Sequence, residues 1–147
     1  MPGPMVETLL LANHAEALNG LLYIQGGGWV HHWRDRPVDG QPPPTAHFGV
    51  AMSILVPWGD TNRRYPLSLE IVPEDGGEPL TRIDASYEVG RPPGTPPGSD
   101  QRSVLAVNFD LHFPADGGYR VSAQTGGSTR EISLYVHDSQ PAGTQAG

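Results

Sequence analysis

The chain has 147 residues, a formal net charge of −7 and no cysteine. This length suits one domain, and the lack of cysteine excludes disulfides, thiolate zinc sites and cysteine nucleophiles. The acidic charge argues against nucleic-acid binding, which needs an excess of basic residues. No apolar run approaches the ~18 residues of a membrane span, and Met1–Asn13 lacks the basic and apolar regions of a signal peptide. We therefore expect a cytoplasmic protein that binds neither nucleic acid nor membrane.

Most of the chain alternates apolar and polar residues with a period of two, which predicts strands with one buried face. Between these runs lie turns such as Asn19-Gly20 and Asp116-Gly117-Gly118, which reverse the chain at little steric cost. The alternation predicts eight strands, at residues 5–13, 20–27, 46–57, 66–73, 80–90, 103–113, 118–124 and 129–137. Eight short strands at this spacing predict an all-β sandwich.

The first third of the chain leaves two points open. Apolar spacing within residues 13–18 also allows a helical turn, although we favour a strand that ends near Asn13 and a tight connection after it. The glycine triplet Gly26–Gly28 predicts a bulge or a close approach of another backbone. After it, Trp29–Trp33 can continue as a short edge segment.

Several loop motifs carry a resemblance to a known family. They are LANHAE at 11–16, LYIQGGGW at 22–29, VPWGDTN at 56–62, GRPPG at 90–94 and GGYRV at 117–121. In these motifs, in this order, the chain resembles a family of small bacterial proteins, frequent in actinobacteria, that is described as a domain of unknown function. Family members often carry a glutamate where this chain has Asp60. The family has no established activity to carry over.

The resemblance implies a single Ig-like antiparallel β-sandwich of seven to nine strands. We place this domain at residues 1–138. The remaining residues, 139–147, contain no apolar residue beyond alanine and are predicted to form a disordered C-terminal tail.

A first candidate binding site lies at one end of the sandwich. If the strands run strictly up and down, the loops at 14–20, 57–65, 91–102 and 124–128 share that end. They would gather His14, Glu16, Trp58, Asp60, Asn62, Arg63, Arg64 and Arg91. The alternative is structural: Asp60 and Asn62 would bond nearby backbone, Trp58 would cap the core, and Arg91 would pair with Asp60.

A second candidate is the outer face of a sheet. Asn108, Asp110 and His112 project from one side of a strand, and the alternate residues of Arg82–Glu88 project from one side of another. If these strands are neighbours, they form a charged cluster, and Asp110-x-His112 has a spacing that a divalent metal could use. A solvated ladder of cross-strand charges is the alternative interpretation.

A candidate interface consists of Trp29, His32 and Trp33, which form a cluster with His31 and Arg34, since Trp and Arg are enriched at protein-binding surfaces. The alternative is an edge that packs on its own loop. His31 and His32 point to opposite faces of an extended strand, so they cannot easily bind one metal. Tyr119 follows a hairpin turn, where Ig-like domains often use a tyrosine to bond upstream backbone.

The sequence contains no recognisable catalytic constellation and implies no cofactor or metal site. We therefore expect a non-catalytic protein-interaction or scaffold module with a protein partner, and a homodimer is one candidate form. The alternative function is binding of a small molecule or a metal, through the loop end at Trp58–Asn62 and Arg91 or through the Asp110/His112 face.

Overall fold

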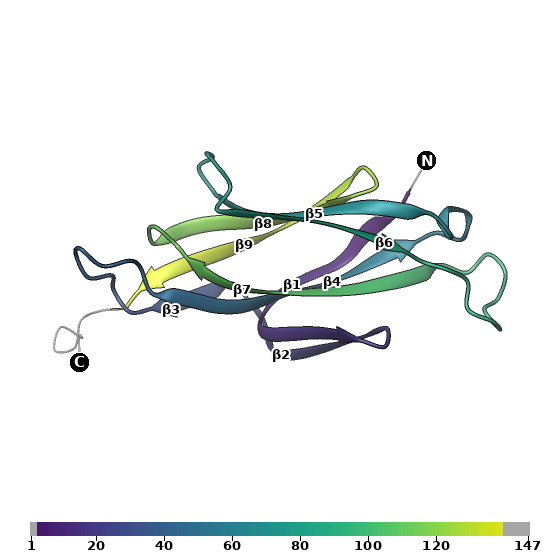
Figure 1. The fold of residues 1–147 in the computed structure, drawn as a ribbon, viewed down its shortest axis with the longest axis horizontal. Coiled ribbons are helices and arrows are strands. Elements are labelled where there is room, and N and C mark those ends of the chain that lie inside the picture. Colours follow the sequence, from purple (N-terminus) through teal and green to yellow (C-terminus); the bar gives the residue numbers. More distant parts are fainter. Residues whose placement is uncertain (1–2, 140–147) are drawn as a thin grey trace.

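The computed structural model describes residues 3–139, which form two packed β-sheets (Figure 1). The first sheet has four strands in the order β2-β1-β4-β7, and the second has five in the order β3-β9-β8-β5-β6. The elements are β1 (Met5–Leu18), β2 (Leu21–Trp29), β3 (His31–Arg34), β4 (Thr45–Val56), the short helix η1 (Trp58–Asp60), β5 (Arg64–Pro73), β6 (Thr81–Glu88), β7 (Gln101–His112), β8 (Gly117–Thr125) and β9 (Ser128–Asp138). The predicted all-β sandwich is confirmed.

The core lies between the two sheets, as the alternation predicts. The even-numbered side chains of β4 are at most 3% exposed. Phe48 of β4 stacks on Phe109 of β7 at a centroid distance of 5.3 Å, and on Phe113 at 6.0 Å. Phe113 in turn contacts Tyr119 of β8 at 4.8 Å, which joins the two sheets. Complete burial of such a side chain contributes roughly 1.5–3 kcal/mol, so these rings anchor the sandwich.

All eight predicted strands are present, and apart from β1 their ends shift by at most two residues. The ninth strand, β3, is the short edge segment allowed at Trp29–Trp33. It lies in the second sheet and pairs with β9 in parallel, whereas every other strand pair within residues 3–139 is antiparallel. The chain changes sheet at Val30, whose carbonyl accepts a hydrogen bond from the Tyr135 amide at 2.8 Å.

A buried arginine fixes β3 in place. The side chain of Arg34 is 3% exposed, and its Nε donates to Asp138 Oδ1 at 2.8 Å. Its Nη1 donates to the Phe113 carbonyl at 2.6 Å. The Ser139 amide donates to the Arg34 carbonyl at 2.7 Å, so the first residue of the predicted tail is bonded to β3. The rest of that tail, residues 140–147, lies outside the described residues.

The prediction that the first strand ends near Asn13 is wrong, because β1 continues to Leu18. Its first half pairs with β4 as far as Ala12, and its second half pairs with β2. The register with β2 shifts between Leu11 and Ala12, where Gly28 is the extra residue with a φ of 96°. The predicted bulge in the glycine triplet is therefore confirmed.

The second half of β1 crosses the outer face of the first sheet with β2 beside it, and Figure 1 shows this hairpin on the side of β4 and β7 that faces away from the second sheet. Ala15 passes directly over Gly49 of β4, where a Cβ atom would lie 2.9 Å from the Ala15 nitrogen. Asn108 of β7 bonds both backbone groups of Ala15. A glycine at position 49 is therefore required for the hairpin to cross here.

Candidate functional site

The β1–β2 hairpin carries a small exposed apolar surface. Leu18, Leu21 and Tyr23 are 53%, 58% and 52% exposed. Leu18 pairs with Leu21, and Glu16 pairs with Tyr23. Cross-strand partners and alternate residues project from one face of a ribbon, so the three apolar side chains lie together. We call Leu18, Leu21 and Tyr23 the hairpin face.

The second strand of this hairpin is also a free edge. Within residues 3–139, β2 pairs only with β1, so one row of its backbone groups is open to another strand. Leu21–Trp29 contains no charged residue, whereas the other edge strands contain Arg102 (β7), Arg82 (β6) and Arg34 (β3). Because charges are a common protection of sheet edges, β2 is the least protected of the four.

Sequence reasoning missed the hairpin face and the β2 edge. The available signal was the set of large apolar residues on both sides of Asn19-Gly20, followed by nine residues, Leu21–Trp29, without a charge. It was overlooked because the sequence of a single strand does not indicate which of its two edges is covered by a neighbour.

His14 and Glu16 lie on the outer face of the first sheet and not, as predicted, beside the Trp58 loop. His14 Nδ1 is 3.3 Å from His47 Nε2, and Glu16 Oε1 is 3.4 Å from His14 Nε2. His47 Nδ1 is 2.8 Å from Asp110 Oδ1. The part of β4 beyond His47 is roughly 30 Å long, which separates this cluster from the loop that follows β4. The prediction failed because β1 bends across the sheet.

These four side chains form a chain of contacts, Glu16–His14–His47–Asp110. The two imidazole nitrogens can hydrogen-bond only if one ring is neutral and accepts. Each ring has its other nitrogen within reach of a carboxylate. Across residues 3–139, no group of three or more His, Asp or Glu side chains is placed to hold a metal ion.

The loop after β4 brings Trp58, Asn62 and Arg91 together, as predicted. The Arg91 guanidinium lies 3.9 Å from the Trp58 ring centroid, and its Nη2 donates to the Trp58 carbonyl at 2.6 Å. Its Nε donates to Thr61 Oγ1 at 2.7 Å. Asn62 has a φ of 63°, and its amide donates to the Val89 carbonyl at 2.7 Å.

These contacts favour the structural interpretation of the loop. Arg91 binds the Trp58 carbonyl and ring in place of the predicted Asp60 carboxylate. The Asp60 carbonyl accepts a hydrogen bond from the Tyr65 hydroxyl at 2.7 Å, and the Arg63 side chain is exposed. The Arg91 guanidinium therefore binds the Trp58 indole, the Thr61 hydroxyl and the loop backbone, and these contacts hold the loop in place.

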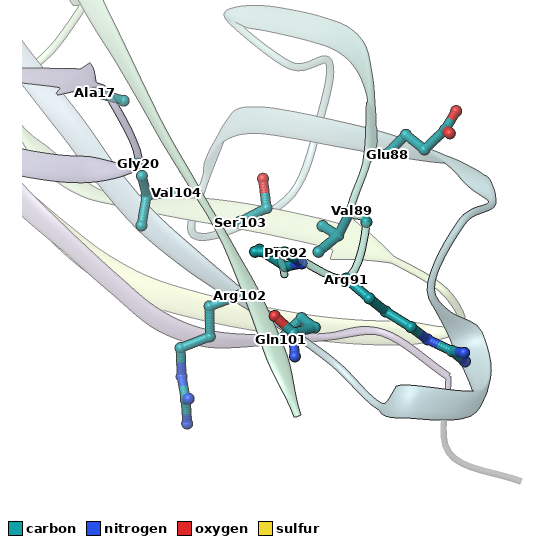
Figure 2. Close-up of a pocket in the computed structure, with 11 residues that line it drawn as sticks. Ala17, Gly20, Glu88, Val89, Arg91, Pro92, Gln101, Arg102, Ser103 and Val104 are labelled. Atoms are coloured by element: carbon teal, nitrogen blue, oxygen red, sulfur yellow. The ribbon is translucent and has the colours of Figure 1, made fainter. Parts of the chain in front are cut away.

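A shallow pocket of about 570 Å³ lies between the hairpin turn, the end of β6 and the start of β7 (Figure 2). Val89 and Pro92 line its middle, and Arg91 and Arg102 lie at its rim. Figure 2 shows both arginine side chains extending away from the pocket. Arg91 reaches the Trp58 loop, and Arg102 Nε donates to a Glu7 carboxylate oxygen at 2.7 Å. The cationic groups are therefore engaged outside the pocket.

The predicted charged face shared by β6 and β7 is wrong, because these strands lie in different sheets. Arg82 instead pairs with Asp84 of its own strand at 3.0 Å. Asp110 and His112 are neighbours on β7, but they have separate partners. Asp110 contacts the histidine of β4, whereas His112 Nδ1 lies 2.6 Å from the Pro43 carbonyl oxygen and donates to it.

The predicted interface of Trp29, His32 and Trp33 divides between two environments. Trp29 packs on the core, and its ring centroid lies 6.2 Å from that of His32. Burial, together with the charge of Arg34, lowers the pKa of His32. Trp33 points outward, is 66% exposed and stacks on His137 at 4.3 Å. Only Trp33 is therefore available at the surface as a large contact residue.

These elements define a small two-sheet β-sandwich that carries an exposed hairpin with an uncharged edge strand. Over residues 7–137 the sequence matches DUF6941, a family described as being of unknown function, and the chain belongs to that family. No curated protein matches the sequence. In the described part of the chain, no helix has the length and apolar character needed to cross a membrane.

Proposed function

We propose that the protein is a non-catalytic interaction module that binds a protein partner through its β1–β2 hairpin. The observation that carries this proposal is the free, uncharged edge of β2 beside the hairpin face. A free strand edge adds a partner strand through backbone hydrogen bonds. Exposed aromatic and aliphatic side chains next to that edge supply contact area.

The anchoring of the hairpin supports this role. Ala15 is bonded to Asn108 at 3.0 and 2.8 Å, so the ribbon is held against the sheet before any partner arrives. A binding element that is already ordered loses less conformational entropy on association. The Trp58 loop, by contrast, has its polar groups bonded to one another.

Two finer assignments belong to the same proposal. The order β1-β4-β7 in one sheet and β9-β8-β5 in the other matches the A-B-E and G-F-C orders of Ig sandwiches, which supports an Ig-like fold. We also retain the cytoplasm as the proposed compartment, which cell fractionation with an antibody to the protein would test.

The interaction can be tested with the immobilised protein and an extract of the cells that produce it. We compare the wild type with Tyr23→Lys on the β2 edge and with Ala85→Lys on the exposed β6 edge. The wild type and Ala85→Lys should retain the same protein, which can include untagged copies of the chain, and Tyr23→Lys should lose it. Equal retention by all three proteins would contradict the proposal.

A further inference from the structure

We propose that the occupant of the β2 edge is a second copy of this chain, whose β2 pairs antiparallel with the first about a two-fold axis. This inference rests on the proposed function, because it requires the β2 edge to be a binding surface. Two-fold dimers, in which the same patch is used on both subunits, are the commonest protein oligomers.

The backbone limits the pairing to one short segment. The turn at Asn19-Gly20 closes the hairpin on one side, with φ values of 51° and 76°. On the other side, Gly26 and Gly28 have φ values of 59° and 96°, which interrupt the extended strand. The uninterrupted edge is therefore Leu21–Gln25, and a symmetric pairing over its full length is centred on Tyr23.

This register is self-complementary in its side chains. Tyr23 meets Tyr23 of the second copy, Leu22 meets Ile24, and Leu21 meets Gln25. No charged group is opposed, and the aromatic pair at the centre is a favourable cross-strand combination. The hairpin faces of the two copies then join into one apolar surface, with Leu18 at its margins.

Charge also favours a second copy at this edge over the other edges. Each copy has a net charge of −7, so two copies repel unless they meet where no acidic residue lies close. The nearest carboxylate is that of Glu16, which pairs with Tyr23 across the hairpin. In the dimer the two Glu16 residues are three strand spacings apart, about 14 Å, beyond the Debye length of about 8 Å.

The absence of charged residues from β2 disfavours a basic partner. An Arg-rich or Lys-rich segment is attracted by the net charge of −7, but along β2 itself it would meet no carboxylate with which to pair. An uncharged strand with large apolar residues is the complement that this edge requires, and β2 is itself such a strand. Because the paired segment is short, we expect a reversible dimer at the small end of protein interfaces.

Sedimentation equilibrium of the purified, untagged chain over a range of concentrations tests the inference. The wild type and Ala85→Lys should dimerise alike. Tyr23→Lys places two ammonium groups face to face and should raise the dissociation constant by about 100-fold or more. Each added lysine also lowers the net negative charge of a copy and so weakens the general repulsion between copies. That effect alone would lower the dissociation constant, which is the opposite of the change expected here. Equal far-UV spectra and urea midpoints establish that the variants are folded.

Disulfide trapping tests the register, because the chain has no cysteine of its own. Under mild oxidation, Tyr23→Cys alone should form a covalent dimer. Gln25→Cys alone should do so far more slowly, but a mixture of Gln25→Cys and Leu21→Cys should form the mixed dimer. Equal trapping at all three positions, or trapping at none of them, overturns the proposed pairing.

The outcomes separate this inference from the proposed function. A wild type that stays monomeric, or a dimer that survives Tyr23→Lys, overturns the second-copy proposal. If such a chain still retains another protein in a Tyr23-dependent way, the interaction proposal stands and only its partner changes. If retention is also insensitive to Tyr23→Lys, both proposals fail.

Discussion

Asn108 holds Ala15 by both of its backbone groups, although the two residues are far apart in the sequence. Asn108 Oδ1 accepts a hydrogen bond from the Ala15 amide at 3.0 Å, and Asn108 Nδ2 donates to the Ala15 carbonyl at 2.8 Å. A side-chain amide has one acceptor and one donor group, so it can replace a neighbouring strand at this point. The pair fixes the second half of β1 on the sheet.

Replacement of Asn108 by alanine should release this half of β1. Loss of both bonds leaves the Ala15 amide and carbonyl without partners and should cost about 1–3 kcal/mol in the free energy of unfolding, measured in urea. Hydrogen exchange at the Ala15 amide should accelerate. Gln124→Ala, which removes an exposed amide side chain from β8, is the control and should change neither quantity. Unchanged exchange at Ala15 would show that the hairpin is held by other contacts.

Gly49→Ala tests the crossing from the other side. The added Cβ would lie 2.6 Å from Asn108 Oδ1 and 2.9 Å from the Ala15 nitrogen, so the hairpin must move. Overpacking of this kind should lower the unfolding free energy by roughly 1–3 kcal/mol. Gly59→Ala is a matched control, because a Cβ there meets nothing within 4 Å. If the two variants are equally stable, the close approach at Gly49 does not constrain the fold.

The strands could be predicted from the sequence, whereas the crossing of β1 over the first sheet could not. Alternation identified strands such as β4 and β9 because one face of each is buried, and burial is a local pattern. The exposed strand β2 has no buried residue and was recognised from the turns that flank it. The crossing of β1 could not be found in this way, since it depends on contacts between Ala15, Gly49 and Asn108. Gly49 was a partial signal, because a glycine inside a strand often marks a close backbone approach.

The candidate sites show the same limit. Trp58 and Arg91 were correctly grouped, since both belong to loops at the same end of the sandwich. His14 and Glu16 were placed at the same end on the assumption that each strand runs straight from one end of the sandwich to the other. The bend in β1 makes that assumption wrong. Arg34 was grouped only with the surface cluster around Trp33, because nothing in its local sequence indicates that a charge will be buried with Asp138.

Arg34→Met should be strongly destabilising. It removes the partner of the Asp138 carboxylate and the donor to the Phe113 carbonyl in a buried environment. Loss of one member of a buried ion pair costs about 3–5 kcal/mol, which chemical denaturation would detect. Arg34→Lys keeps the charge but cannot reproduce both hydrogen bonds, so its unfolding free energy should lie between those of the wild type and Arg34→Met. Arg102→Ala, at an exposed pair, should have a much smaller effect, and an equal effect would contradict this explanation.

His32 should make the stability depend on pH. Burial lowers its pKa in the folded protein, so the unfolded chain binds this proton more tightly. Its contribution to the unfolding free energy is complete above the unfolded value of ~6.5 and decreases as the pH falls from there toward the lowered pKa. His32→Phe removes the titrating group, so its stability should decline less than that of the wild type over this range in urea titrations. Parallel pH profiles would refute the assignment.

Arg91→Ala should loosen the Trp58 loop without affecting the hairpin. Hydrogen exchange should rise at the Asn62 amide, and the melting temperature should fall, because the guanidinium bonds both Trp58 and Thr61. Arg91→Lys should recover part of the loss through contact with the indole. Dimerisation should be unchanged in both variants. Loss of dimerisation with intact stability would instead make this loop a binding surface.

The parallel pair of β3 and β9 also has a consequence for how the chain folds. Arg34 and Asp138 are 104 residues apart, so their contact closes a loop of nearly the whole domain. Closing such a long loop has a large entropic cost, and non-local pairing of this kind slows folding. We expect this edge to form after the main barrier. Arg34 variants should then accelerate unfolding in stopped-flow experiments while the refolding rate stays close to that of the wild type.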